Sequence, residues 1–282
     1  VNPLAGSPTT TLPDETAQYS EYDGEPLTVA IWRPKGQVAS GDAPVALFAH
    51  GGGWSEGTNI DDNSGVKQDL ADRGWLVVSV EYTLSSPTHP TWDLAEAQIG
   101  CAMIWASENA GSYGADASRL VVLGDSAGGN LAINASSRAN AGALTPSCDG
   151  DIPRVSAVAT VYPGVDPYGL YARTIPLGGE PGRNPITQYI GGTPDEFPER
   201  YKAVASSTYI SSMMPPTLVI QGTNDHLVDP GRVYDFVDQA RDAGADIELV
   251  LIPYADHVFD ASPIGAQLYK GITLNWLEDH GF

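Results

Sequence analysis

Three segments of this sequence carry residue types that suit acyl transfer, and the sharpest is Gly-Asp-Ser-Ala-Gly-Gly at residues 124–129. It places Ser126 between two glycines, follows an apolar run and opens a helical pattern. That strand–turn–helix context presents a serine as a nucleophile, and the glycines keep side chains away from the neighbouring backbone in the tight turn. The alternative interpretation is a glycine-rich turn that binds phosphate at a helix N-terminus.

The second segment is His-Gly-Gly-Gly-Trp at residues 50–54, directly after the apolar run Val45–Ala49. Backbone N–H groups of such a loop can face a ligand unobstructed, and acyl transfer needs donors of this kind where the tetrahedral oxyanion forms. The N–H of Ala127, the residue after the predicted nucleophile, is expected to be a further donor. We expect His50 to anchor the loop by hydrogen bonds. A flexible loop is the alternative, but both motifs follow predicted strands, which argues against coincidence.

The third requirement is a general base, and His257 fits it best among five histidines. It follows the predicted strand Ile247–Ile252 and precedes the last predicted helix, so it should lie over the edge of the sheet. His226 competes, but it adjoins Asp225, and adjacent side chains point in different directions, so these two cannot form the acid–base pair. The remaining histidines are expected to anchor a loop, to touch the pocket or to be solvated: His50, His89 and His280.

Asp225 is the predicted acid of the triad, because it follows the predicted strand Thr217–Gln221 and keeps the chain order Ser, Asp, His. It would hold His257 in the productive tautomer and stabilise its imidazolium. Three other aspartates have simpler explanations, as a helix cap, a neighbour of the base and a brace of the serine turn: Asp229, Asp256 and Asp125.

These residues must be positioned by strands and helices, which alternate in the apolar pattern from about residue 25 to the end. The predicted strands, the first of them at a sheet edge, are Pro26–Arg33, Val45–Ala49, Trp75–Val80, Leu120–Leu123, Val155–Tyr162, Thr217–Gln221 and Ile247–Ile252. The predicted helices are Asp61–Arg73, Trp92–Asn109, Ser126–Ala141, Gly231–Ala243 and Pro263–Asp279. Such alternation predicts an α/β fold with a mostly parallel sheet covered by helices on both faces.

One segment, Pro163–Pro216, interrupts the alternation with glycine and proline pairs and several aromatic residues. Long insertions of this kind are usually functional or disordered, and the aromatic residues favour order. We predict a cap over the carboxyl edge of the sheet rather than a separate domain. The predicted organisation is an N-terminal tail over residues 1–20 and one domain over residues 21–282, with a cap-like insertion at about residues 163–216.

The composition excludes some classes of partner. The chain has 35 acidic and 14 basic residues, a formal net charge of −21, and its basic residues form no cluster. A nucleic-acid partner is therefore not expected, and an anionic membrane surface is disfavoured for the same reason. No stretch approaches the roughly 18–20 apolar residues of a membrane-spanning helix, so we expect no membrane insertion of this chain.

The first 20 residues and the cysteines bear on the compartment. A start at Val1 and a stretch rich in Pro, Thr and Ser favour a secreted or extracytoplasmic protein, with the cytoplasm as the alternative. Cys101 and Cys148 could pair in an oxidising compartment, or Cys101 could be a free buried cysteine in an apolar helix. The sequence leaves both possibilities open, and it leaves the oligomeric state open. Without a Cys-x-x-Cys pair, zinc binding and redox chemistry are not predicted.

In combination, the motifs at residues 50–54 and 124–130, the Asp225 segment and His257-Val-Phe259 resemble the hormone-sensitive-lipase-like family of α/β-hydrolases. The resemblance covers nearly the whole chain from about residue 26. It implies a serine carboxylesterase on the α/β-hydrolase fold. It also implies a role for single residues: Ser126 as nucleophile, Asp225 as acid, His257 as base, and Gly52, Gly53 and Ala127 as oxyanion-hole donors, with Gly51 shaping the loop.

The chain departs from that family in two respects. Its segment before the glycine motif reads as strands instead of a helical cap, so the insertion must control access, as in the smaller feruloyl/acetyl-esterase and arylformamidase relatives that it resembles. Residues 82–87, Tyr-Thr-Leu-Ser-Ser-Pro, stand where the family often has Tyr-Arg-Leu-Ala-Pro-Glu, which leaves the substrate open.

We therefore expect hydrolysis of small-molecule esters with short to medium acyl chains through an acyl-enzyme, without a metal or an organic cofactor. The alternatives on the same triad are an amidase or arylformamidase and a plant-wall acetyl or feruloyl esterase. A binding module that has lost catalysis is the alternative outside enzymes. Trp54, Tyr82 and His89 are expected to line the substrate pocket, with core packing as the alternative for the aromatic residues.

Overall fold

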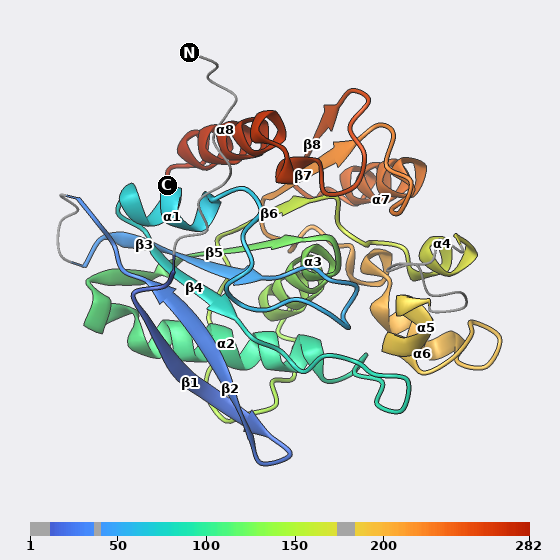
Figure 1. Ribbon diagram of the computed structural model, residues 1–282, viewed down its shortest axis with the longest axis horizontal. Helices are drawn as coiled ribbons and strands as arrows, with labels where there is room; N and C mark the ends of the chain where they lie inside the picture. The colour runs from blue at the N-terminus through green and yellow to red at the C-terminus, as the bar shows by residue number, and fades with distance from the viewer. Residues whose placement is uncertain (1–11, 37–40, 174–183) are drawn as a thin grey trace.

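The computed structural model describes residues 12–36, 41–173 and 184–282 (Figure 1). Its central feature is an eight-stranded sheet in the order β1-β2-β4-β3-β5-β6-β7-β8. Strand β2 runs antiparallel to both of its neighbours, β1 and β4, and β3 to β8 are mutually parallel. The strands are β1 (Glu15–Tyr22), β2 (Glu25–Trp32), β3 (Ala43–Ala49), β4 (Leu76–Val80), β5 (Ala115–Asp125), β6 (Ala157–Val161), β7 (Thr217–Gly222) and β8 (Ile247–Ile252). The α/β-hydrolase fold predicted from the sequence is confirmed.

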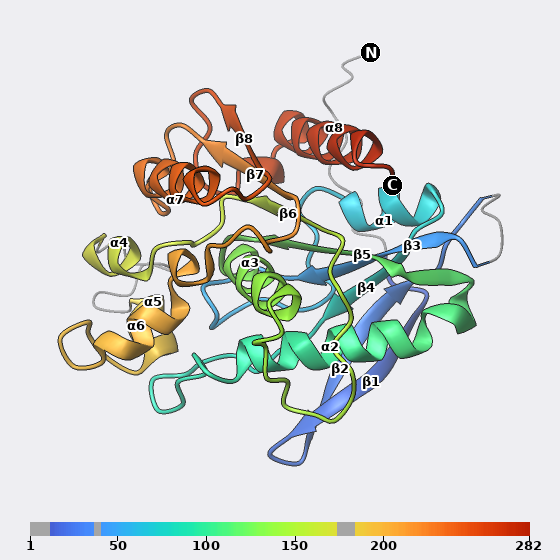
Figure 2. The same ribbon diagram turned by 180° about the vertical axis from the view of Figure 1, so that it is seen from behind.

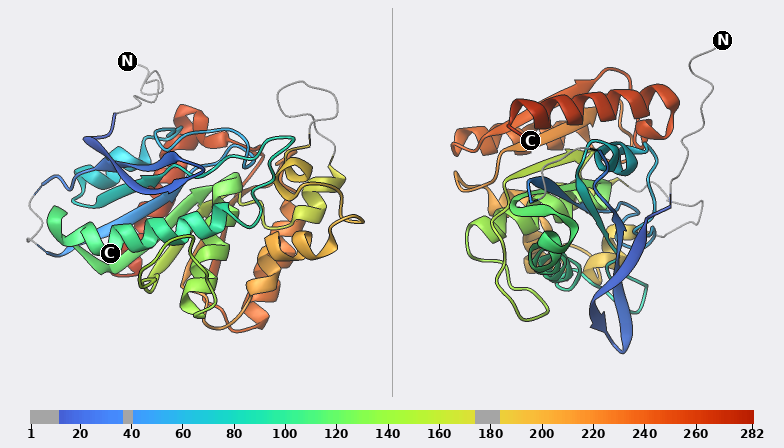
Figure 3. Two further views of the ribbon diagram at one scale, coloured as in Figure 1. Left: turned by 90° about the horizontal axis from the view of Figure 1, so that it is seen from below. Right: turned by 90° about the vertical axis from the view of Figure 1, so that its left-hand side faces the viewer.

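Helices cover both faces of this sheet, which explains why its inner strands are apolar at almost every position. The main helices are α1 (Val66–Asp72), α2 (Ala95–Asn109), α3 (Ser126–Asn140), α7 (Pro230–Asp242) and α8 (Pro263–Asp279). Residues of α2, α3 and α7 share one hydrophobic core with one set of strand side chains, and residues of α1 and α8 share a second core with the alternate set. The two views of Figure 3 show the sheet lying between these helix layers.

The first edge of the sheet differs from the prediction. Strand β1 begins at Glu15, inside the segment predicted as a tail, and pairs antiparallel with β2. Consequently β2 is not an edge strand, because β1 covers one side and β4 the other. The side chains of β1 are alternately exposed and half-buried, so its sequence lacks the apolar run that marks the inner strands. The rest of the predicted tail, residues 1–11, lies outside the described residues.

The parallel register brings the predicted chemical segments to one edge of the sheet. Ala49 at the end of β3 pairs with Gly124 on β5, so the two glycine motifs begin side by side. Gly222 at the end of β7 pairs with Ile252 at the end of β8. The loops that carry Asp225 and His257 therefore also start together. This placement agrees with the general rule that ligands bind beyond the carboxyl ends of the strands in α/β folds.

The insertion between β6 and β7 forms a small group of short helices. They are α4 (Pro167–Ala172), α5 (Pro185–Ile190), α6 (Pro198–Val204) and the 3-10 turn η3 (Ser206–Tyr209). Each α-helix begins at a proline, and the side chains of Asp166 and Asn184 cap α4 and α5. Figures 1 and 2 both place this group at one end of the molecule, next to α7. The glycine and proline pairs of residues 178–182 lie outside the described residues.

Cys101 on α2 and Cys148 in the loop after α3 form a disulfide, with 5.8 Å between their Cα atoms. The disulfide decides between the paired and the free cysteine, which the sequence left open.

Among the described residues, none of the helices has the length and apolar character that crossing a bilayer requires.

Candidate active site

The turn between β5 and α3 holds Ser126 in a strained conformation. Its φ is +51°, a left-handed value that a side chain with a Cβ rarely adopts. The two glycines around it are sterically required: a Cβ on Gly124 would overlap the carbonyl group of Gly128, and a Cβ on Gly128 would overlap that of Ala49. The spacing recognised in the sequence is therefore the spacing that lets this turn pack against β3.

The three predicted triad residues meet at this turn. Nε2 of His257 lies 3.0 Å from Oγ of Ser126, and Nδ1 of the same ring lies 2.9 Å from Oδ2 of Asp225. The side chain of Asp225 is fully buried, and that of His257 is 11% exposed. A serine hydroxyl, an imidazole and a buried carboxylate in this order form a nucleophile, its base and the group that orients the base.

Asp225 is held from both of its carboxylate oxygens. Oδ1 accepts the backbone N–H groups of Leu227 and Val228 at 2.9 and 2.8 Å. Oδ2 accepts the side-chain amide of Gln221 at 3.1 Å in addition to facing His257. These bonds fix the carboxylate against rotation, so the imidazole has one partner in one place.

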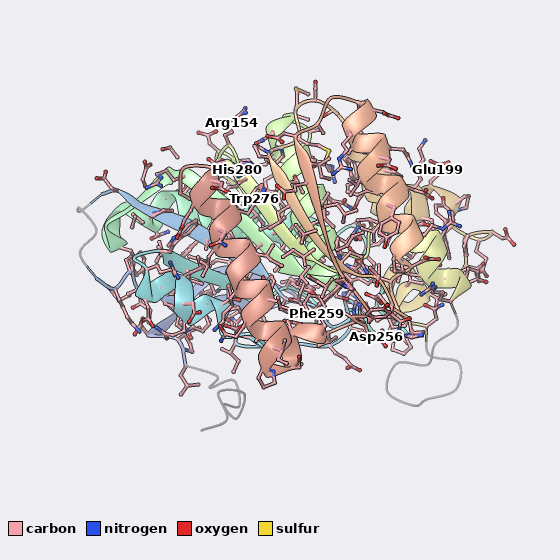
Figure 4. All side chains as sticks on the ribbon, turned by 90° about the horizontal axis from the view of Figure 1, so that it is seen from above. Arg154, Glu199, Asp256, Phe259, Trp276 and His280 are labelled. Atoms are coloured by element: carbon pink, nitrogen blue, oxygen red, sulfur yellow. A yellow bond between two sulfur atoms is a disulfide. The ribbon has the colours of Figure 1, made fainter. Side chains whose placement is uncertain are left out.

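The competing candidates form a different pair. Nδ1 of His226 lies 2.9 Å from Oδ2 of Asp256, and Oδ1 of Asp256 accepts the backbone N–H groups of His226 and His257 at 2.9 and 2.7 Å. The bonds from His226 are the main reason that the pKa of Asp256 falls to about 2. Figure 4 shows Asp256 in the loop between β8 and α8. The pair therefore ties the loop after β7 to the loop that carries His257, and Asp229 caps α7 as predicted.

Hydrogen bonds hold the glycine loop next to Ser126. The N–H of Gly51 donates to Oδ1 of Asp125 at 3.0 Å, and Nδ1 of His50 lies 2.7 Å from the carbonyl oxygen of Gly51. Gly52 and Gly53 have φ values of +107° and +60°. Both border the cavity at Ser126. The N–H of Gly51 already donates to Asp125 and is not available to a substrate oxygen. This fits the prediction that Gly51 shapes the loop while Gly52 and Gly53 are the donors.

The predicted third donor sits at the start of a helix. Ala127 is the second residue of α3, and the N–H groups of a first helical turn have no partner within the helix. The positive end of the helix dipole lies at the same place. A substrate oxygen beside Ser126 would thus meet backbone donors from two separate segments of the chain.

Buried ionisable groups border the same cavity as this loop. The ammonium of Lys67 donates to the carbonyl oxygens of Asn59 and Asp61 at 3.1 and 2.6 Å, and burial lowers its pKa. Burial, with a further contribution from the charge of Asp260, raises the pKa of Asp125 to about 6. Burial also lowers the pKa of His50 to about 4. His50 is therefore neutral at pH 7, which suits the anchoring role that the sequence predicted.

One part of the site was not recognised in the sequence. The ring of Tyr162 lies 4.4 Å from that of His257, and its hydroxyl donates to Oδ1 of Asp260 at 2.6 Å. Tyr162 has a φ of +39°, which marks a strained residue directly after β6. Tyr162 and Asp260 are 98 positions apart in the chain, so no local motif could have indicated the pair. Tyr162 therefore packs against the ring of the base, and Asp260 holds the hydroxyl of Tyr162.

Two cavities meet at Ser126. The larger has a volume of about 490 Å³ and is bordered by Ser126, Gly52, Gly53 and His257, and further away by polar side chains. The smaller has a volume of about 40 Å³ and a mostly apolar wall. Within the described residues, no group of three or more His, Cys, Asp or Glu side chains is arranged to hold a metal ion.

The three residues predicted to line the pocket have different places. Trp54 borders the small cavity and stacks on Tyr189 of the insertion, with 4.6 Å between ring centroids. Tyr82 borders neither cavity: it is buried under the glycine loop, where its hydroxyl donates to the carbonyl oxygen of His50 at 2.8 Å. His89 borders neither cavity, and its ring lies 5.8 Å from that of Tyr22 on β1.

The prediction of pocket contact is therefore wrong for Tyr82 and His89. Tyr82 follows β4 and turns its ring toward the core, because stacking on His50 at 4.3 Å buries it. Its contribution is to hold the glycine loop. His89 is kept in a tight turn by paired backbone hydrogen bonds with Ser86, both at 3.0 Å.

Comparison with known proteins identifies relatives of this chain. The model of the BD-FAE family matches residues 30–239. Esterase LipQ of Mycobacterium tuberculosis is 28% identical over 82% of this chain and 53% of its own length. Ethyl acetate hydrolase of Pseudomonas putida is 29% identical over 84% of this chain and 72% of its own length. The chain thus spans little more than half of LipQ, and it spans a similar share, 56%, of the probable carboxylic ester hydrolase LipM.

Solved structures show the same fold. A thermophilic esterase from Thermogutta terrifontis with propionate bound superposes with a TM-score of 0.76, at 24% identity over 95% of this chain and 94% of the other. The same esterase phosphorylated by paraoxon superposes with a TM-score of 0.74, at 23% identity over 95% and 94% of the two chains. At this level of identity the likeness concerns the fold.

Proposed function

The chain belongs to the BD-FAE family, within the hormone-sensitive-lipase-like α/β-hydrolases, and from this membership we propose that it is a serine carboxylesterase. The observation that carries the proposal is the unbroken contact series from Asp225 through His257 to Ser126. Relatives named as esterases and as a hydrolase of ethyl acetate support the same reaction class. The expected substrates are small-molecule esters with short to medium acyl chains.

The proposed reaction has two steps. Oγ of Ser126 attacks the ester carbonyl carbon while Nε2 of His257 takes the hydroxyl proton, and the resulting oxyanion accepts hydrogen bonds from the N–H groups of Gly52, Gly53 and Ala127. The C–O bond of the ester then breaks, and His257 gives its proton to the leaving alcohol oxygen. Water, deprotonated by the same imidazole, attacks the acyl-enzyme and releases the acid and Ser126. Asp225 stabilises the imidazolium in both steps.

The first test is hydrolysis of p-nitrophenyl esters from acetate to palmitate by the wild type and by Ser126→Ala. We expect activity on the shorter esters and a loss of roughly 10³-fold or more in the variant, because no other group can form the acyl-enzyme. Labelling of Ser126 by a fluorophosphonate gives a second readout that does not depend on the choice of ester. A wild type that hydrolyses none of the esters and resists labelling would exclude a serine esterase and leave a non-catalytic module.

Two neighbouring reactions use the same residues. An amidase or arylformamidase would prefer N-formyl aryl amines to acetyl esters of similar size, and a plant-wall esterase would prefer acetylated or feruloylated sugars. Comparing kcat/KM for an aryl acetate, the matching N-formyl arylamine and a feruloyl ester separates the three. A clear preference for the formamide would replace the carboxylesterase proposal.

We also infer an extracytoplasmic location. The disulfide between Cys101 and Cys148 supports it, because such bonds persist in oxidising compartments and are rare in the cytosol. Fractionating the source cells and alkylating thiols before electrophoresis provides the test. Recovery of the chain in the cytosol with both thiols free would contradict this location.

A further inference from the structure

The residues that border the two cavities indicate that the alcohol and the acyl group of the substrate bind in different cavities. Ser126 and Gly53 border both cavities, whereas His257 borders only the larger one. In the proposed reaction His257 must protonate the leaving oxygen, so the alcohol has to depart on the side of the imidazole. The alcohol therefore belongs to the cavity of about 490 Å³ and the acyl chain to the cavity of about 40 Å³.

The small cavity has little room for an acyl chain. Roughly 10–15 Å³ of cavity volume holds one water molecule, so a cavity of about 40 Å³ has room for about three water-sized groups. That fits an alkyl group of up to about three carbons beyond the carbonyl carbon. The polar side chains in its wall already have partners: Arg173 donates to the carbonyl oxygen of Asp225, and Asn184 caps α5. The remaining wall is mostly apolar, which suits an alkyl group.

The insertion supplies part of the wall of this cavity. Leu170 on α4 and Ile186 on α5 stand opposite Ala127 and Trp54 of the main domain. Ile186 is 1% exposed and Trp54 is 3% exposed, so neither can turn outward without leaving a void. Gly164 completes the wall, and a Cβ added there would lie 3.3 Å from Leu170 and 3.4 Å from Trp54. Packed side chains thus border the cavity on the side of the insertion.

We propose that Leu170 and Ile186, which border the small cavity together with Trp54, are specificity-determining residues that restrict the acyl group to short chains, from acetyl to about butyryl. The inference rests on the proposed esterase function and narrows its substrate class to short-acyl esters of larger alcohols. Chain length is limited by packing, since a longer acyl chain would have to displace the buried Ile186 or the half-buried Leu170.

The test compares acyl preference in matched variants of the full chain. Ile186→Ala removes part of the wall. Ile190→Ala removes the same atoms from the same helix, at a residue that is 0% exposed and borders neither cavity. Gly164→Ala does the opposite, since its new methyl group would occupy part of the cavity. For each protein, kcat/KM is measured on p-nitrophenyl acetate, propionate, butyrate and hexanoate, and unfolding is followed to confirm the fold.

The wild type should prefer acetate and propionate to hexanoate by at least tenfold. Ile186→Ala should raise the hexanoate-to-acetate ratio at least tenfold, because a few methylenes gain room. Ile190→Ala should leave that ratio within twofold of wild type even if the variant is less stable. Gly164→Ala should lower the propionate-to-acetate ratio. Leu170→Ala serves as the second enlarging variant if Ile186→Ala fails to fold.

The failures of the two proposals are distinguishable. An active wild type that prefers hexanoate, or enlarging variants with an unchanged ratio, would overturn the assignment of the small cavity and leave the esterase intact. A wild type that cleaves no ester and is not labelled at Ser126 would overturn both. Equal shifts in Ile186→Ala and Ile190→Ala would show that loosening of the insertion, and not this wall, sets chain length, and would also reject the inference.

Discussion

The two carboxylate oxygens of Asp225 have different hydrogen-bond partners. Oδ1 accepts two backbone N–H groups, and Oδ2 faces Nδ1 of His257. Asp225→Asn would keep its carbonyl oxygen toward the two N–H donors and turn its NH₂ group toward the ring. His257 would then carry its proton on Nε2, where it can no longer accept one from Ser126. We expect kcat to fall by roughly 10³- to 10⁴-fold while the fold persists.

Steady-state kinetics and fluorophosphonate labelling, with circular dichroism as the control for folding, measure this loss. A fall of less than tenfold would mean that another group orients the base. Asp256→Asn is a suitable comparison, because that carboxyl group binds His226 and the backbone instead of the imidazole of His257. It should reduce kcat far less.

Asp125 makes stability depend on pH in a particular window. Its pKa is raised from 3.8 to about 6, so the folded state binds a proton more tightly than the unfolded state does. The resulting stabilisation is complete below pH 3.8 and is lost as pH rises through about 6. Asp125→Asn keeps an acceptor for the N–H of Gly51 and removes the ionisation. The variant should therefore become more stable relative to wild type as pH rises from 4 to 7, by up to about 3 kcal/mol.

Urea unfolding of both proteins at several pH values between 4.5 and 7.5 measures the difference directly, and other titrating groups cancel between them. A difference that does not change with pH would show that Asp125 ionises with an ordinary pKa. Activity is the control for the glycine loop, which should stay in place because Oδ1 of the amide can still accept from Gly51.

Single site residues could be predicted from the sequence where their roles depend on chain order and on their position in loops that follow strands. Ser126, Asp225 and His257 each follow a strand, so the sheet brings them to one edge. The sequence could not show which way an aromatic ring turns after a strand, and for that reason Tyr82 was misplaced. The contact of Tyr162 with His257 depends on the same tertiary packing.

The contact between β3 and α3 leaves no room for a side chain at Gly128. A Cβ there would overlap the carbonyl of Ala49 and crowd that of His50, and both belong to backbone that cannot move away. Gly128→Ala should lower the free energy of unfolding by about 3 kcal/mol or more and remove activity, because Ser126 and the glycine loop would be pushed apart.

Gly271→Ala is the matched control. This glycine lies within α8, and a Cβ there meets nothing within 4 Å. Alanine should therefore stabilise the helix by about 0.5–1 kcal/mol. Chemical denaturation of the two variants beside wild type makes the comparison. If both substitutions had the same effect, the close approach at Gly128 would not be the cause.

Among elements, the inner strands and long helices could be predicted because burial on both faces forces apolar runs and regular periodicity. Predicted and observed bounds coincide for α8 and β8 and differ by a few residues elsewhere, with α1 starting at Val66 instead of Asp61. Strand β1 could not be predicted, since half of it faces solvent and its pairing with β2 is a tertiary event.

For the whole molecule, chain topology and charge followed from the sequence, whereas the partner of each cysteine did not. Cys101 and Cys148 are 47 positions apart, and only the packing of α2 against the loop after α3 brings them together. The net charge of −21 could be counted from the sequence, but the positions of the charges on the folded molecule could not be predicted. In the fold, several acidic residues come to border the larger cavity: Glu56, Asp61, Asp62, Asp125 and Asp260.

This distribution predicts a preference for cationic alcohols. Among the described residues that border the cavity assigned to the alcohol, five are acidic, and the one ammonium, that of Lys67, is bound to two carbonyl oxygens. Field lines from a chain of net charge −21 converge on such a cavity and raise the local concentration of cations. Acetylcholine and 3,3-dimethylbutyl acetate form a matched pair, because they have nearly the same shape and differ by one positive charge.

We expect kcat/KM to be higher for acetylcholine than for its neutral analogue at low ionic strength. The ratio should fall toward one as salt rises from about 0.01 to 1 M, because the screening length shrinks from about 30 to about 3 Å over that range. Asp61→Asn should lower the ratio at low salt and leave hydrolysis of the neutral ester nearly unchanged, since Asp61 borders the cavity without touching the triad. A ratio that is the same at both ionic strengths would place the acidic residues outside the path of the alcohol, and the leaving group would then be selected by shape alone.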